Sequence, residues 1–168
     1  TANWALAAGG ESSDAGEDVA VDAPGNSYVA GTFVLNMSLD GTPVASNGDA
    51  DAFVAKIDAG GNLAWLRKVG GADNDGAVGV EVDAAGNVYV GGWFETSMTF
   101  AGQTVTANGQ RDSFVTKFTA AGEPQWVRTV SAPTDRPFAL ATTTAGDVAP
   151  AATFTGTATS GAASVSTA

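Results

Sequence analysis

Apolar and polar residues alternate along three short segments of this chain, at 18–22, 27–33 and 51–58. A period of two is typical of a β-strand whose two faces have different neighbours. A further strand is predicted at 63–69, and a small hairpin at 37–44, with Gly, Pro, Asn and Asp at the turns between them. Because no long window carries apolar residues at helical spacing, the pattern predicts an all-β chain of short antiparallel strands.

The alternation assigns the side chains of the strand at 27–33 to two opposite faces. Tyr28, Ala30 and Thr32 are predicted on one face, and Val29, Gly31 and Phe33 on the other. A glycine within a strand usually marks the close approach of another backbone. Gly31 therefore predicts that one sheet packs tightly on the next at this position.

The whole pattern recurs with a period of about 61 residues, which Trp4, Trp65 and Trp126 keep. The turn Asp22-Ala23-Pro24-Gly25-Asn26 returns as Asp83-Ala84-Ala85-Gly86-Asn87, and the strand Asp51-Ala52-Phe53-Val54-Ala55-Lys56 returns as Asp112-Ser113-Phe114-Val115-Thr116-Lys117. Four antiparallel strands per copy are typical of a β-propeller blade. One such sheet cannot bury both faces alone, so we expect the copies to stack face to face.

The third copy is less regular than the first two. Residues 144–148 stand where the Asp-Ala-x-Gly-Asn turn should recur, after a one-residue deletion, and no charged residue follows Asp147. That last stretch is either a weakly specified strand pair or a disordered end. The sequence thus divides into a first blade repeat at 1–64, a second at 65–125, and a degenerate, truncated third at 126–168.

The composition supports a folded domain, since 44% of the 168 residues are hydrophobic and only 15% are charged. The formal net charge is -11. Such a chain repels phosphate backbones and anionic lipid headgroups, so we expect neither nucleic-acid binding nor membrane insertion. No window has the length and apolar content of a membrane-spanning helix.

The chain contains no histidine and no cysteine. A Ser-His-Asp or Cys-His catalytic site is therefore excluded within it, as are disulfides and nearly all zinc and copper sites. Asp22 and Asp83 are candidates for paired carboxylates, but each recurs at the same place in its repeat. A catalytic group is normally used once, so we interpret both as caps that accept backbone N–H groups of their own turns. We expect no enzyme activity and no catalytic residues.

Acidic loops precede the first strand of each copy, with Asp14 and Asp18 in the first and Asp73 and Asp75 in the second. Carboxylates on loops suit Ca²⁺, and Asp73-Asn74-Asp75-Gly76 has part of a calcium-loop spacing but lacks the distal Glu. Two interpretations stay open: a calcium site formed by these aspartates, and solvated turns between blades. No other cofactor is expected.

Most aromatic residues recur between copies and are expected to fill the interfaces between sheets. Trp93 differs, because its counterpart in the first copy is Thr32. A large aromatic residue that is used once is a candidate for a contact with a protein partner, with packing in the core as the alternative.

Taken together, the motifs resemble the bacterial β-propeller repeat known as the SBBP repeat. The pattern is Asp-Ala-x-Gly-Asn-x-Tyr-Val-x-Gly, then Asp-x-Phe-Val-x-Lys, Gly-x-x-x-Trp and Gly-Gly; the first copy matches it at 22–31, 51–56, 61–65 and 70–71, and the second at 83–92, 112–117 and 122–126. The resemblance implies a propeller in a secreted or surface-exposed bacterial protein, and so an extracellular, cell-surface or periplasmic location. It implies no enzyme activity and supplies no shared catalytic residues.

Propellers usually have four to eight blades, and this sequence holds fewer than three. An open stack exposes sheet faces and strand edges, which favour association with a protein partner or with another copy. The sequence thus predicts an incomplete β-propeller that serves as a non-catalytic structural or protein-interaction module of a larger chain or assembly. Two alternatives remain: an extracellular carbohydrate- or calcium-binding module, and a fragment of a propeller enzyme whose catalytic residues lie elsewhere.

Overall fold

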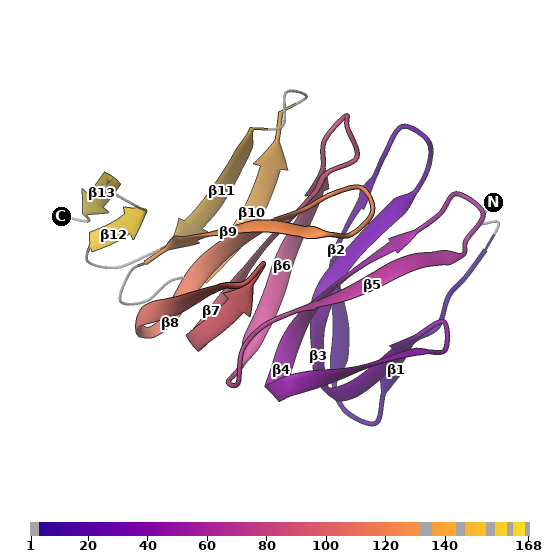
Figure 1. Ribbon diagram of the computed structural model, residues 1–168, viewed down its shortest axis with the longest axis horizontal. Helices are drawn as coiled ribbons and strands as arrows, with labels where there is room; N and C mark the ends of the chain where they lie inside the picture. The colour runs from indigo at the N-terminus through magenta and orange to yellow at the C-terminus, as the bar shows by residue number, and fades with distance from the viewer. Residues whose placement is uncertain (1–3, 132–135, 144–146, 154–156, 161–162, 167–168) are drawn as a thin grey trace.

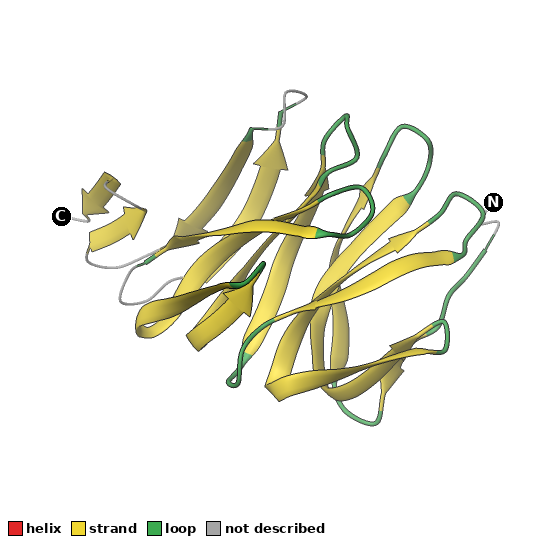
Figure 2. Ribbon diagram, viewed as in Figure 1, coloured by secondary structure: helices red, strands yellow, loops and turns green. Residues whose placement is uncertain are grey.

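The computed structural model of the chain describes residues 4–131, 136–143, 147–153, 157–160 and 163–166. Within these residues the chain forms strands and turns without a helix, and every strand pair is antiparallel. The all-β prediction is therefore confirmed. No helix long and apolar enough to cross a membrane is found in this described part. Two large sheets and two small hairpins follow one another between the termini (Figure 1 and Figure 2).

The first sheet contains β1 (Ala8–Gly10), β2 (Asp14–Val21), β3 (Ser27–Leu39), β4 (Thr42–Ile57) and β5 (Leu63–Val69). Strand β4 lies between β3 and β5, while β2 and β1 pair with successive halves of β3. The predicted strands are all present. Strands β3 and β4 also continue into the hairpin predicted at 37–44, after a register shift between Val34 and Asn36.

The second sheet repeats this arrangement with β6 (Asp75–Val82), β7 (Val88–Phe100), β8 (Gln103–Phe118) and β9 (Pro124–Val130) in the order β6-β7-β8-β9. The break between the sheets falls at residues 70–74. Strand β5, which carries Trp65, pairs with β4 and closes the first sheet. The repeat boundary placed at 64/65 in the sequence thus lies inside that closing strand.

The third copy forms two small hairpins, which are in chain order β10 (Arg136–Thr142) with β11 (Val148–Thr153), and β12 (Thr157–Ser160) with β13 (Ala163–Ser166). The turn between β10 and β11 keeps the repeat's chemistry, because Thr143 N–H donates to the Asp147 carbonyl at 2.9 Å and Asp147 N–H donates to Thr143 Oγ1 at 3.1 Å. The final segment contains the strand pair that was one of its two predicted states. Most of the turn at 144–148 lies outside the described residues.

The turns at the ends of β2 and β6 are held by their own aspartates. Asp22 accepts hydrogen bonds from Asn26 N–H (2.8 Å), Asn26 Nδ2 (2.7 Å) and Tyr28 OH (3.0 Å). Asp83 accepts the same three kinds of bond in the second sheet. Burial raises the pKa of Asp22, but the hydrogen bonds from Asn26 and Tyr28 outweigh it, so the pKa lies below its usual value. The prediction that these aspartates cap their turns is confirmed.

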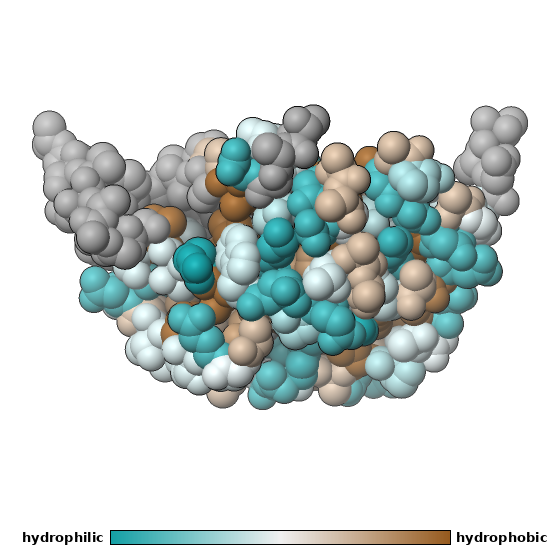
Figure 3. Space-filling model, turned by 45° about the horizontal axis from the view of Figure 1, so that its top comes forward, coloured by the Kyte–Doolittle hydropathy of each residue, from teal (hydrophilic) through white to brown (hydrophobic). Residues whose placement is uncertain are grey.

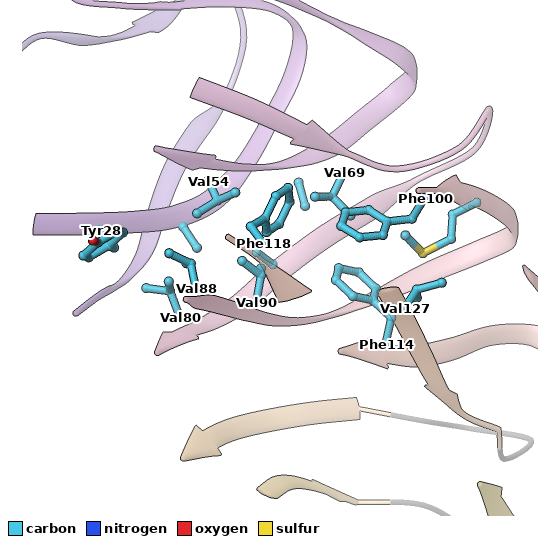
Figure 4. Packing of buried hydrophobic residues seen from close by; sticks show 14 of the residues in the cluster. Tyr28, Val54, Val69, Val80, Val88, Val90, Phe100, Phe114, Phe118 and Val127 are labelled. Atoms are coloured by element: carbon cyan, nitrogen blue, oxygen red, sulfur yellow. The ribbon is translucent and has the colours of Figure 1, made fainter. Parts of the chain in front are cut away.

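One face of the first sheet packs on one face of the second and forms the main core. Side chains of the first sheet, including Tyr28, Val54 and Val69, meet side chains of the second, including Val80, Val88, Val90, Phe114 and Phe118 (Figure 4). A smaller cluster on the opposite face of the first sheet contains Phe33, Met37, Leu39, Phe53 and Ala55. The two faces predicted for the strand at 27–33 are therefore confirmed, with Tyr28 and Ala30 in the first cluster and Phe33 in the second.

The role predicted for Gly31 is wrong in one respect. A Cβ added at Gly31 would collide with the carbonyl oxygen of Ala15 and lie 2.8 Å from the Phe53 ring, and both groups belong to the same sheet as Gly31. Gly92 meets the Gly76 carbonyl and the Phe114 ring in the same way. The close approach comes from the neighbouring strand, next to a bulge in the β2–β3 ladder, and not from the adjoining sheet.

Candidate functional site

The face of the first sheet opposite the main core is covered only in part, because Phe33 and Phe53 are buried there while Val19 and Val21 are exposed. Val19 and Val29 are cross-strand neighbours on this face. The exposed fraction is 60% for Val19 and 62% for Val21, whereas Val80, the counterpart of Val19 in the second sheet, is 1% exposed. The first sheet covers Val80, but among the described residues no further sheet packs over Val19. We call the side chains of Val19, Val21, Val29 and Leu66 the open face.

The open face has the residue pattern of a sheet interior. Three of its four counterparts in the second sheet, Val80, Val90 and Val127, are 1% exposed or less, and the fourth, Val82, packs half-buried against the main core. On the side of the molecule that Figure 3 shows, by contrast, polar and apolar residues are interspersed, as on an ordinary protein surface. Residues suited to burial thus lie at the N-terminal end of the stack, where they can bind another apolar sheet.

A second contact joins the outer strand of the first sheet to the turn between β8 and β9. The Trp65 ring covers Gly122, where an added Cβ would lie 2.7 Å from the ring atom Cδ2. Trp65 Nε1 donates a hydrogen bond to the Ala120 carbonyl at 3.2 Å, and Arg67 Nε donates to the Gly122 carbonyl at 2.8 Å. We call the pair Trp65 and Arg67 the Trp–Arg clamp. It requires glycine at the turn, where Gly122 has a φ of 77° and no side chain to meet the ring.

Three of the four aspartates predicted to bind calcium accept backbone hydrogen bonds. Asp14 accepts N–H groups from Gly10 (2.6 Å) and Val34 (3.2 Å), and Asp75 accepts those of Gly71 (2.5 Å) and Glu95 (3.2 Å). These bonds link Gly10, at the end of β1, to Val34 in β3, and Gly71, before β6, to Glu95 in β7.

Asp18 reaches across the stack, because its carboxylate accepts the N–H of Val80 in the second sheet at 2.9 Å. Asp73 is exposed. In the part of the chain that the structure describes, no three acidic, His or Cys side chains lie together in a way that could hold a metal ion. Calcium binding by Asp14, Asp18, Asp73 and Asp75 stays a prediction.

A pair of buried carboxyl groups lies between the two sheets, and sequence reasoning missed it. Asp51 on β4 and Asp75 on β6 are both 0% exposed, and both would contact a Cβ added at Gly70. Burial, together with the negative charge of Asp51, raises the pKa of Asp75 to about 7. Asp51 Oδ1 is buried and accepts no N–H or O–H from the described residues unless Asp75 carries a proton. The two groups can therefore share one proton.

A hollow of about 610 Å³ lies between the turns at the ends of β2 and β6. Its acidic side chains already have partners within the chain. Asp22 and Asp83 hold their own turns, and Glu81 accepts a hydrogen bond from Thr142 Oγ1 at 3.5 Å. Burial and the nearby Asp18 raise the pKa of Glu81. This arrangement stabilises neighbouring turns and inner strands.

Trp93, predicted as a partner contact, lies half-buried within a cluster specific to the second copy. The guanidinium carbon of Arg111 lies 3.7 Å from the centre of the Trp93 ring, and Arg111 forms an ion pair with Glu95 at 2.7 Å. The first copy has Thr32, Ala50 and Val34 at these positions and cannot form the same contacts. The ring thus packs under an arginine of its own sheet. Its contact with a partner stays a prediction.

Comparison with known proteins adds one partial similarity. No known protein-family model matches the chain. The chain is 31% identical over 92 residues to a protein described as the regulatory protein FlaEY of Caulobacter vibrioides. That alignment covers 52% of this chain but only 9% of FlaEY, so the chain spans a small part of the length of this relative.

Proposed function

We propose that this chain is a non-catalytic module of stacked β-propeller blades, part of a larger chain or assembly, whose open face binds a further blade of the same kind. The difference between Val19 and Val80 supports the proposal most directly. Equivalent valines are exposed in the first sheet and buried in the second, because among the described residues a sheet packs on that side of the second sheet but not of the first. A face with the residues of an interior is stabilised when a matching sheet covers it.

Two further features support a structural role. The sequence contains no histidine or cysteine, and the recurring aspartates Asp22 and Asp83 are engaged in holding turns. The resemblance to SBBP repeats also leads us to propose a bacterial protein exposed outside the cytoplasm, at the cell surface, in the periplasm or secreted. A partner for such a module would be recognised by sheet stacking.

The test extends the chain at its N-terminus with a further copy of residues 70–122, so that Trp4 takes the place that Trp126 has in the second repeat. We expect the backbone amides of Val19 and Val29 to exchange more slowly with deuterated solvent than in the unextended chain, and the melting temperature to rise. The matched control carries Val115→Asp in the added copy only, which places a charge on the side that would meet the open face. Unchanged exchange at Val19 in the extended chain would refute the proposed stacking.

A further inference from the structure

The second sheet carries its own copy of the Trp–Arg clamp, formed by Trp126 and Arg128 on β9. Trp126 lies 6.1 Å from Tyr89 at an interplanar angle of 55°, and Trp65 lies 6.3 Å from Tyr28 at the same angle. Arg128 Nη1 donates to the Val127 carbonyl at 3.0 Å, just as Arg67 Nη1 donates to the Leu66 carbonyl at 2.9 Å. The second clamp therefore has the geometry of the first.

The two clamps differ in what they hold. Trp65 is 8% exposed beneath the turn of the next sheet, and Arg67 bonds that turn. Trp126 is half-buried and Arg128 is exposed. No carbonyl among the described residues accepts the indole N–H of Trp126, and none beyond its own strand accepts the Arg128 guanidinium. The second clamp therefore has the side-chain geometry of the first but holds no turn among the described residues.

The described sheet of the third copy lacks the strand that precedes the clamped turn in the second copy. Strands β3 and β7 each pair on one side with an inner strand and on the other with β4 or β8. In the described part of the third copy, β11 pairs with β10 alone. No described strand pairs with the other edge of β11, and in the first two copies the turn that follows the third strand carries Gly61 or Gly122.

We propose that Trp126 and Arg128 bind the glycine turn of a β-hairpin that has the sequence of the second half of this repeat, and that its first strand pairs with β11. The inference rests on the proposed stacking function and identifies a second docking surface at the opposite end of the stack. The turn is recognised by two carbonyl acceptors and by a glycine with positive φ, as at Ala120 and Gly122. Strand pairing with β11 supplies backbone hydrogen bonds.

A probe for this site is a synthetic peptide with the sequence of residues 112–130, in which Trp126 is replaced by Phe. The peptide is titrated into the full chain while the indole N–H signals of the protein are followed by nitrogen-15 NMR. We expect the Trp126 indole signal to move downfield as it gains a carbonyl acceptor, and the Trp4 signal to stay in place. A peptide with Gly122→Val is the matched control, and we expect its affinity to fall about tenfold or more.

Two protein variants complete the test. Arg128→Ala changes an exposed side chain and should keep the fold while weakening peptide binding; Trp4→Phe should bind like the parent chain. Loss of binding in Trp4→Phe, or equal binding of the Gly122→Val peptide, would overturn the proposal. These outcomes do not depend on exchange at Val19, so failure here is distinguishable from failure of the stacking function.

Discussion

The first and second sheets have the same strand order and the same turn chemistry, yet they bury their side chains differently. Val80 and Val90 lie in the main core, whereas Val19 is mostly exposed. Full burial of one valine contributes about 1.5–3 kcal/mol relative to leaving it exposed. Burial at a given repeat position is therefore decided by the neighbouring sheet, and the second sheet depends on the first for its stability.

The largest effect is expected when a charged side chain replaces either of the equivalent valines, Val19 and Val80. Val80→Asp places an unpaired carboxylate in the main core and should lower the free energy of unfolding by about 4 kcal/mol or more, or prevent folding. Val19→Asp should change it by less than about 0.5 kcal/mol, because the side chain stays in water. Urea denaturation followed by circular dichroism measures both. Similar losses in the two variants would mean that Val19 is covered in solution.

A more moderate effect should come from pH, through the carboxyl pair between the sheets. The pKa of Asp75 is about 7 in the folded chain against its ordinary 3.8, so the folded state binds the extra proton between these values. The contribution of Asp75 to the free energy of unfolding is therefore fully present below about pH 4 and is lost as the pH rises through about 7. We expect the melting temperature to fall by about 3–6 °C between pH 5 and pH 8.

The variants Asp75→Asn and Asp14→Asn test whether Asp75 carries this pH dependence. In Asp75→Asn the amide cannot titrate, so the fall in melting temperature with pH should shrink; its single oxygen can accept only one of the N–H groups of Gly71 and Glu95, so the variant should also be less stable at every pH. Asp14→Asn should leave the fall with pH intact. The other charged groups that face the pair are Lys68, 3.7 Å from Asp51 Oδ2, and Glu95 with its partner Arg111. An undiminished fall in Asp75→Asn would show that another group carries it, with Glu81, whose pKa is also raised, the first to examine.

The weakest effect concerns the two-residue turns of the β3–β4 and β7–β8 hairpins. Both central residues have positive φ, 51° and 75° at Asp40-Gly41 and 50° and 75° at Ala101-Gly102. Aspartate tolerates this conformation better than alanine does. Ala101→Asp should therefore raise the free energy of unfolding by about 0.5–1 kcal/mol, and Asp40→Ala should lower it by a similar amount. Thermal melting of both variants checks the prediction, and effects of the same sign would contradict it.

Much of the fold was predictable from local patterns. The strands at 27–33, 51–58 and 63–69, their two faces, and the caps at Asp22 and Asp83 follow from alternation and turn chemistry, which act over a few neighbouring residues. The period of about 61 residues also placed the tryptophans that recur at the clamps.

Other features could not be predicted, because they depend on which segments meet in space. Asp51 and Asp75 belong to different copies, and nothing in either local pattern indicates that their carboxyl groups lie together. The close contact at Gly31 was assigned to the wrong neighbour, since a strand glycine signals proximity but not the identity of the approaching backbone.

Local sequence is enough to specify the repeated unit: its strands, its turns and the side of each strand that is apolar. Which of those apolar sides is covered depends on the packing of the sheets. Val19 and Val80 occupy the same place in the pattern, but Val80 is buried because a sheet packs over it, and Val19 is exposed. Alternation is a property of a single strand, whereas burial is a property of two surfaces in contact.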